Sequence, residues 1–352
     1  MTYDALAERL ATDESEPRIV ALPDGSVDTY YDAFDERGDR IPTRDAFADR
    51  LASEDHEAVP IEPTARESGG QAVNMAKQAR ALGAETVCYG HLDDPVFEDL
   101  AMETHSMGEP SRISIFAFDD ADRLLAERSA DVRGWSLRIL EAAAGAASAK
   151  DTLDAARDAL DADAICCGNW ASVDGLTDAI EDLAAGPLAA GAFVLDPGAV
   201  SGRSDEAVWD LLDALAELDE RTDVAYSVNR AELEGTVEAI ESASGHDRTV
   251  RENLRRVREA AGIAAVVLHE VDLAAAATRD GVIVVEALDV ADPQRRTGAG
   301  DRFSAGLAVG RVRGWDWETT LALGNACAAY AVETAATGTR NELRAFVERK
   351  TS

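Results

Sequence analysis

The chain has 352 residues, enough for a large core in one α/β domain with an appendage or in two domains. Its formal net charge is −34, and its lysines are Lys77, Lys150 and Lys350 alone. So acidic a surface repels nucleic acid and anionic membranes, and we expect neither as a partner. The same composition is typical of a solvated surface in high salt, where charges are screened over a few ångström. It therefore indicates a halophile-like environment and leaves the function open.

Cysteine spacing and hydropathy favour a cytoplasmic protein. Cys88, Cys166, Cys167 and Cys327 show no C-x-x-C spacing, and the histidines show no metal-binding spacing. Free thiols suit a reducing compartment. We find no signal-peptide pattern at the start of the sequence and no apolar run of membrane-spanning length.

Apolar runs that alternate with helical patterns predict a mainly parallel, doubly wound α/β sheet. Residues 1–17 are polar and acidic, and we interpret them as an N-terminal surface extension to a main domain over 18–352. Ligands of such sheets bind beyond the carboxyl ends of the strands. The predicted strands are 19–22, 84–90, 164–168, 192–195, 224–228, 264–268 and 282–285, and the predicted helices are 71–82, 136–160, 173–185, 205–218, 230–242, 250–261, 302–312 and 317–334.

Two further regions do not fit this alternation. Residues 35–66 are charged and contain three prolines, so they could form short strands or an excursion from the main fold. Residues 113–118 alternate with period two, and 124–127 could return as a second strand. We expect that hairpin to lie off the main sheet.

A small-residue turn at 297–301 is the segment most suggestive of chemistry. Gly298 and Gly300 let the backbone approach a ligand closely, and the N–H groups at the start of the next helix can face an anion. Asp301 stands where it could take a proton from an attacking hydroxyl. An ordinary capped helix would also place an acid there, because an acid in the first turn favours the helix dipole.

Asn229 and Glu232 form a second informative pair. Asn229 follows a predicted strand, and a glutamate three residues later completes a capping pattern. The functional alternative is that both side chains face the crevice at the strand ends, where they could hold hydrated Mg²⁺ against a nucleotide.

Together these segments resemble the ribokinase family, the PfkB carbohydrate kinases. The resemblance covers about residues 18–340, and three motifs in the family's order carry it. They are Gly69-Gly70 with Asn74 and Leu82-Gly83, then Asn229-x-x-Glu232, then Thr297-Gly298-Ala299-Gly300-Asp301-x-Phe303-x-Ala305-Gly306. The segments Gly90–Asp94 and Leu195–Gly198 also have counterparts in the family.

The resemblance implies a three-layer αβα domain with a small β lid drawn from about 28–66 and 113–128. It implies a cytoplasmic kinase that moves the γ-phosphate of ATP, with Mg²⁺, to a hydroxyl of a sugar or nucleoside, and a homodimer through the lid. By motif position, Asp301 is the catalytic base and Gly298, Ala299 and Gly300 form the anion hole. Asp28, Gly69, Gly70 and Asn74 contact the acceptor, Asn229 and Glu232 hold Mg²⁺ through water, and Thr297, Asn325 and Gly338 belong to the nucleotide site.

Two departures from the family pattern matter. Arg295 and Arg296 stand where the family has Asp-Thr, an Asp that helps to bind a monovalent cation. We hypothesise that a guanidinium replaces this cation, and activity that required K⁺ at constant ionic strength would count against the idea. The family's T-x-G-x-x-G segment is also missing, with 268–272 near that position.

Several functional alternatives stay open on the sequence. A nucleoside kinase or a ketodeoxy sugar-acid kinase is close to the leading interpretation, and a non-catalytic relative that senses a sugar or nucleotide is the alternative from another class. The chain lacks G-x-x-x-x-G-K-[ST], which excludes a P-loop kinase. No G-x-G-x-x-G follows the first strand, so nothing indicates a nicotinamide enzyme.

Overall fold

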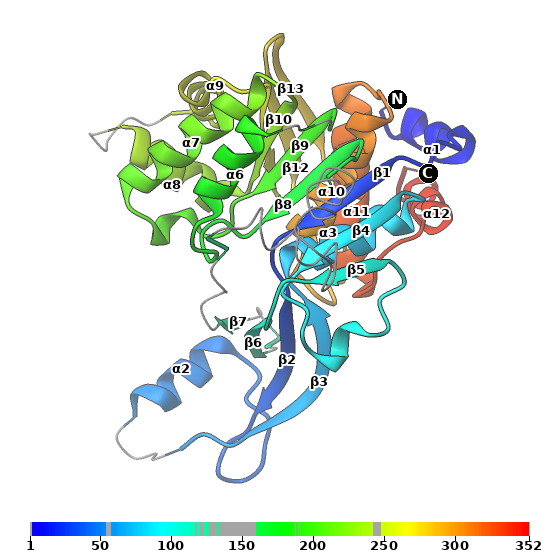
Figure 1. Ribbon diagram of the computed structural model, residues 1–352. Helices are drawn as coiled ribbons and strands as arrows, with labels where there is room; N and C mark the ends of the chain where they lie inside the picture. Colours follow the sequence, from blue (N-terminus) through cyan, green and yellow to red (C-terminus); the bar gives the residue numbers. More distant parts are fainter. Residues whose placement is uncertain are drawn as a thin grey trace.

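The computed structural model describes residues 2–53, 58–116, 118–119, 123–126, 132–133, 160–186, 188, 190–241 and 248–351. A nine-stranded sheet in the order β13-β12-β11-β10-β9-β8-β1-β4-β5 forms its centre (Figure 1). In this order, every neighbouring pair of strands between β11 and β5 is parallel, which confirms the predicted doubly wound sheet. They are β1 (Arg18–Leu22), β4 (Glu85–Gly90), β5 (Glu103–Ser106), β8 (Ala164–Gly168), β9 (Ala192–Asp196), β10 (Asp223–Val228) and β11 (Ala265–His269).

An antiparallel hairpin completes one edge of this sheet. It consists of β12 (Leu273–Thr278) and β13 (Gly281–Glu286), and β12 pairs with β11. The sequence predicted β13 as one more strand of the βα alternation and missed β12. Four consecutive alanines in β12 have low β propensity, and burial against both layers decides their conformation.

A second sheet, in the order β3-β2-β6-β7, extends away from the main one and forms the lid (Figure 1). The chain passes from β1 through a short turn into β2, so the lid begins at the carboxyl edge of the main sheet. The hairpin predicted off the main sheet corresponds to β6 and β7, which pair antiparallel. The elements are β2 (Ser26–Ala33), α2 (Arg44–Ala52), β3 (Ile61–Gly69), β6 (Ser111–Phe116) and β7 (Arg123–Ala126).

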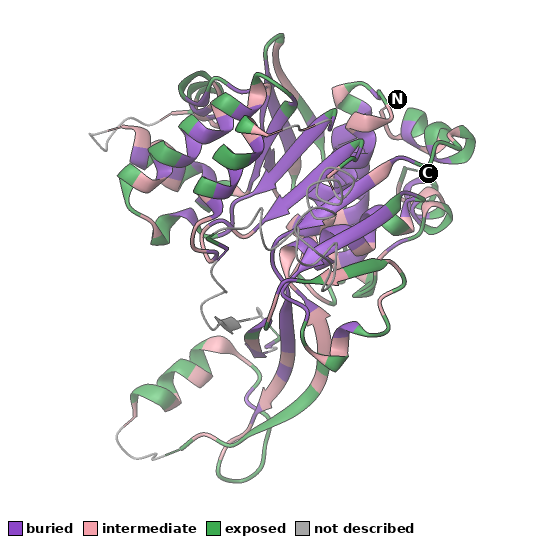
Figure 2. Ribbon diagram, viewed as in Figure 1, coloured by how far each residue is buried: buried purple, intermediate pink, exposed green. Residues whose placement is uncertain are grey.

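Helices cover both faces of the main sheet, and two separate hydrophobic cores result. Figure 2 shows the sheet as buried and the outer helix faces and much of the lid as exposed. One core lies under α6 (Leu176–Ala185), α7 (Asp205–Asp219), α8 (Arg230–Ile240) and α9 (Val250–Ala261). The other lies under α3 (Gln71–Ala81), α10 (Ala299–Val312), α11 (Trp317–Thr334), α12 (Arg340–Thr351) and α1 (Thr2–Thr12).

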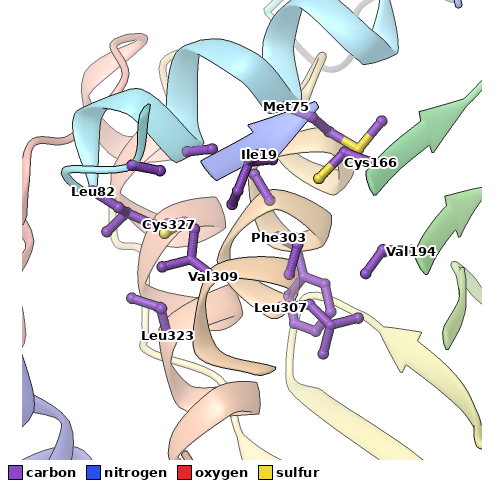
Figure 3. Close-up of a cluster of buried hydrophobic side chains, with 14 of the residues drawn as sticks. Ile19, Met75, Leu82, Cys166, Val194, Phe303, Leu307, Val309, Leu323 and Cys327 are labelled. Atoms are coloured by element: carbon purple, nitrogen blue, oxygen red, sulfur yellow. The ribbon is translucent and has the colours of Figure 1, made fainter. Parts of the chain in front are cut away.

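The helix α10, which carries the predicted catalytic turn, is buried along most of its length. Figure 3 shows its side chains Phe303, Leu307 and Val309 among residues of the sheet, α3 and α11. Phe303 is 1% exposed, and its ring lies under Gly324 of α11. This packing holds the start of α10 in a fixed position against the sheet.

The N-terminal segment differs from its prediction as a surface extension. Residues 2–12 form α1, which buries Leu6 and Leu10 completely against the core shared with α11 and α12. The segment looked polar because the helix exposes Asp4, Glu8 and Arg9 on the face away from its two leucines. Burying two leucines removes enough apolar surface to stabilise this attachment by roughly 3 to 6 kcal/mol.

Two short helices complete the described elements, η1 (Pro95–Phe97) and η2 (Val200–Gly202). The helix predicted over 136–160 lies almost entirely outside the described residues. Within the residues that are described, no helix is long and apolar enough to cross a bilayer.

Candidate active site

The start of α10 forms a turn whose backbone can accept an anion. Gly298 is its N-cap and has φ +78°, a left-handed conformation that glycine adopts without strain. The N–H of Ala299 donates weakly to the carbonyl of Arg296 at 3.3 Å. For the N–H of Gly300, no acceptor exists among the described residues. That amide lies at the positive end of the helix dipole and is free to bind an anion.

Asp301 lies in the first turn of α10 and is only 7% exposed. Its Oδ2 accepts a hydrogen bond of 2.7 Å from Nδ2 of Asn74 on α3. Burial raises the pKa of the Asp301 carboxyl, and the Arg302 guanidinium and the Asn74 hydrogen bond partly oppose that rise. A carboxylate with a raised pKa beside an anion-binding turn is suited to general-base work.

The lid brings a second carboxylate to this site. Asp28 on β2 is buried, and its Oδ1 accepts a 2.6 Å hydrogen bond from the Ser26 hydroxyl. Burial raises the pKa of Asp28 to about 6, and the negative charge of Asp301 adds to the effect. Gly69 at the end of β3 lies so close to Asp28 that a Cβ there would stand 2.1 Å from Oδ2. The structure therefore brings together Asp28, Gly69, Asn74 and Asp301.

Gly70, the residue after Gly69, is the N-cap of α3. The N–H groups that follow it, from Gln71 and Ala72, donate to the carboxylate of Asp24 at 3.0 and 2.7 Å. Asn169 donates to the same carboxylate at 3.0 Å. The positive end of α3 is thus occupied by a side chain of the protein, whereas that of α10 is open.

Asn229 and Glu232 form a complete capping box at the start of α8. The Asn229 carbonyl oxygen accepts from the Glu232 N–H at 3.1 Å, and Glu232 Oε2 accepts from the Asn229 N–H at 2.8 Å. Burial raises the pKa of Glu232 to about 7, and the Asp301 charge contributes. The pair therefore has the structural role that the capping pattern predicted.

Asp196 at the end of β9 bonds to residues of both α3 and α10. Its carboxylate accepts from Gln71 Nε2 at 2.9 Å and from the Ser304 hydroxyl of α10 at 3.4 Å. Burial raises its pKa well above the usual range, and the charges of Glu232 and Asp301 raise it further. Three desolvated carboxylates thus meet at the carboxyl edge of the sheet, where a cation would relieve their repulsion.

The remaining predicted nucleotide-site residues are more dispersed. Thr297 lies in the 297–301 turn, directly before Gly298. Asn325 is buried in α11, and its Nδ2 donates to Tyr3 of α1 at 3.2 Å and to the carbonyl of Glu286 at 3.4 Å. The Gly338 carbonyl accepts from Gln78 of α3 at 3.0 Å. The hydrogen bonds of Asn325 therefore join α11 to α1 and β13, and the bond to Gly338 joins α3 to the segment before α12.

Arg295 reaches the lid. It pairs with Glu67 of β3 at 2.8 Å and lies over the Tyr30 ring at 4.4 Å from the ring centre. Arg296 is exposed. The Arg302 guanidinium contacts the turn, because its Nη1 donates to the Gly298 carbonyl at 2.9 Å.

Comparison with known proteins now identifies the chain. Residues 2–350 match the family described as prokaryotic ketohexokinase. The chain belongs to this family. A ketohexokinase of Haloferax volcanii is 27% identical over 97% of this chain and 94% of its own length. The protein is thus an ATP-dependent sugar kinase of the ribokinase class, a phosphotransferase with an alcohol as acceptor.

Solved structures show that this kinase has the ribokinase fold. The Escherichia coli phosphofructokinase-2 structure with substrates and products has a TM-score of 0.65, with 15% identity over 96% of the kinase and 100% of that chain. Arabidopsis thaliana ribokinase with ribose and ATP has a TM-score of 0.64, 16% identity and coverage of 95% and 99%. The nucleoside kinase of Methanocaldococcus jannaschii has a TM-score of 0.63, 14% identity and coverage of 95% and 100%.

Sequence reasoning did not single out several residues that lie at this edge of the sheet. Asp24 follows the apolar strand β1, and His269 ends the apolar strand β11. A polar residue at either position lies at the edge of a parallel sheet where ligands bind. That signal could have identified both. Asp196 appeared only as part of a segment with a family counterpart, and Arg302 occupied an unspecified position in the last motif.

Proposed function

We propose that the kinase phosphorylates a ketohexose at one of its hydroxyl groups, with Asp301 as the general base. The ketohexose follows the family match and the Haloferax volcanii relative. The observation that supports the chemistry is a buried carboxylate at Asp301 beside the unpaired N–H of Gly300. The carboxylate of Asp28 on the lid is near enough for its charge to act on Asp301.

Each group has one role in the proposed transfer. Asp28 and Asn74 orient the sugar by hydrogen bonds to its hydroxyls. Asp301 removes the proton from the acceptor hydroxyl as that oxygen bonds to the terminal phosphorus of ATP. The bond from this phosphorus to the bridging oxygen breaks, and ADP leaves with the electron pair. The amides of the 298–300 turn stabilise the charge on the phosphoryl group in transit.

The residues present also fit a magnesium–nucleotide complex. Among the described residues, no group of three or more His, Cys, Asp or Glu side chains is arranged to hold a metal alone. The mutual repulsion of Glu232, Asp196 and Asp301 favours a cation at this edge, and Glu232 with Asn229 would hold Mg²⁺ through water. When bound, Mg²⁺ would neutralise charge on the nucleotide phosphates.

Activity should fall as the pH decreases through about 7 to 6. Asp28, Glu232 and Asp301 act as ionised acceptors, and burial raises the pKa of Asp28 to about 6 and of Glu232 to about 7. Protonation below a raised pKa removes the working form, so the acidic limb of kcat/KM lies above the usual carboxyl range near 4. Initial rates at constant ionic strength in molar KCl would measure it. A flat profile down to about pH 5 would contradict the proposal.

A substrate panel tests the acceptor. ATP with D-fructose, aldohexoses, pentoses, nucleosides and ketodeoxy sugar acids should give turnover with the ketohexose at the highest kcat/KM. Preference for a nucleoside or a sugar acid would leave a kinase with another acceptor. Binding without turnover across the panel would instead support the non-catalytic sensor.

The lid gives support to a homodimer. β3 is an edge strand of the lid sheet with mostly exposed residues, and Ile61 at its start is 45% exposed. An exposed edge strand leaves backbone N–H and C=O groups unpaired, so it can pair with a second copy. We expect twice the chain mass in sedimentation velocity at molar KCl, and Ile61→Lys should shift it towards the monomer. A wild-type monomer at micromolar concentration would refute this.

We also place the enzyme in the cytoplasm, on the ground that all four cysteines are free and buried.

A further inference from the structure

Arg302 brings a positive charge to the turn that carries the general base. A Cβ added at Gly298 would stand 2.4 Å from Nη1 of Arg302, 3.2 Å from Nδ2 of Asn74 and 3.4 Å from Oδ2 of Asp301. The guanidinium, the amide and the carboxylate therefore surround one point of the turn. The hydrogen bond from Nη1 to the Gly298 carbonyl fixes the guanidinium there.

This position is locally unfavourable for an arginine. It lies in the first turn of α10, where the helix dipole opposes a positive charge. Burial lowers the pKa of the Arg302 guanidinium, so its charge is desolvated. Within the described residues it forms no ion pair within 4.0 Å. Packing alone would be served better by an uncharged side chain, so the charge itself calls for an explanation.

The charges around Asp301 explain why a positive charge is placed at Arg302. The pKa of Asp301 is raised by burial, and the charge of Arg302 is the strongest of the effects that lower it. Lys77 and Arg295, the other nearby cations, are bonded to the Ser68 carbonyl and to Glu67. The titratable and charged groups that face this site from the surrounding elements are Asp24, Asp28, Glu67, Lys77, Asp196, Glu232, His269, Arg295 and Arg302.

We propose that Arg302 is a positioning residue whose guanidinium, held on the Gly298 carbonyl, places a positive charge beside Asp301 and holds the Gly298 turn in shape. The inference rests on the proposed role of Asp301 as base. Without the guanidinium, the base would be surrounded mainly by carboxylates and would take up a proton at a higher pH. The enzyme would then lose its base over the range in which it must work.

Three substitutions separate the charge from the packing. Arg302→Gln keeps a hydrogen-bond donor for the Gly298 carbonyl and removes the charge, Arg302→Met removes both, and Arg302→Lys keeps the charge. We expect the acidic limb of kcat/KM to move up by about one to two pH units in the Gln and Met variants. We expect kcat/KM at pH 7 to fall at least about tenfold in both. The limb of the Lys variant should stay within about half a unit of wild type.

Arg313 offers a matched control at the other end of α10. Its Nη2 donates to the carbonyls of Ser15 and Leu82, at 3.0 and 2.9 Å, away from the turn. Arg313→Met should lower Tm and leave the acidic limb unchanged. The assays use ATP with the best acceptor of the substrate panel, so they do not depend on that acceptor being a ketohexose.

The outcomes are distinguishable. If Asp301→Asn is inactive and Arg302→Gln folds with an unmoved acidic limb, the inference about Arg302 is overturned and the base assignment stands. If Asp301→Asn retains wild-type turnover, the proposed base itself is wrong. Should Arg302→Met fail to fold, the comparison of Gln with Lys decides the question.

Discussion

Replacing Asp301 by asparagine should lower kcat by about 10³-fold or more while sugar binding persists, because a positioned general base contributes roughly 10² to 10⁴. Asparagine has nearly the same shape, and its carbonyl oxygen can still accept the 2.7 Å bond from Asn74. Only the ability to take up a proton is lost. Initial rates give kcat, and calorimetric titration of the sugar gives Kd. Turnover within tenfold of wild type would contradict the assignment.

The same variant should be at least as stable as the wild type. Burial raises the pKa of Asp301, so the ionised carboxylate lowers the free energy of unfolding at neutral pH. Asparagine removes this charge. An equal or higher Tm would therefore exclude unfolding as the cause of lost activity. Asp316→Asn is a matched control for the change from aspartate to asparagine. Asp316 is the N-cap of α11, and asparagine caps a helix as well as aspartate does.

Local patterns in the sequence were sufficient for much of the fold. The strands from β8 to β11 appear as short apolar runs because a parallel sheet covered on both faces buries nearly all of their side chains. The turn at 297–301 was also recognisable, because Gly298 and Gly300 mark a backbone that bends tightly before a helix. These features depend on neighbours in sequence.

Features that depend on distant partners were not recognisable. The alanines of β12 form a strand only because β11 and β13 lie on either side, and Leu6 is buried only because α11 and α12 receive it. The capping residues Asn229 and Glu232 were correct as a local pattern, whereas Asn325 meets Tyr3 from the opposite end of the chain. No spacing rule reaches across 322 residues.

The site was predicted only in part, because some of its features also depend on residues that are distant in the sequence. Its motif residues converge as expected at Asp28, Asn74 and Asp301. The positive charge beside Asp301 comes from Arg302, and its effect appears only when the surrounding carboxylates are placed in space. A pKa depends on the surrounding charges in space, so the sequence showed which groups can titrate and the structure showed in which direction they shift.

Replacing Gly300 by alanine should reduce kcat by about 10² to 10³-fold, the usual loss when one anion-hole donor is displaced. A Cβ there would stand 2.9 Å from Cε1 of His269. The imidazole cannot easily retreat, since its ring lies 5.0 Å from the ring of the buried Phe303. The turn must therefore shift, and the unpaired N–H moves with it. Steady-state kinetics with saturating sugar would measure the loss.

Gly202→Ala controls for the added methyl group, because a Cβ at Gly202 meets no atom within 4 Å, and its kcat should equal the wild-type value. The double variant His269→Ala with Gly300→Ala provides the sharper test. Removing the imidazole gives the new methyl group room, so kcat should recover by about tenfold or more relative to Gly300→Ala, a coupling of the size found between residues in contact. Without such recovery, the clash with His269 is not what displaces the turn. If Gly300→Ala alone keeps full kcat, the Gly300 amide does not bind the phosphoryl group, and the anion hole must be sought in other backbone groups of the turn.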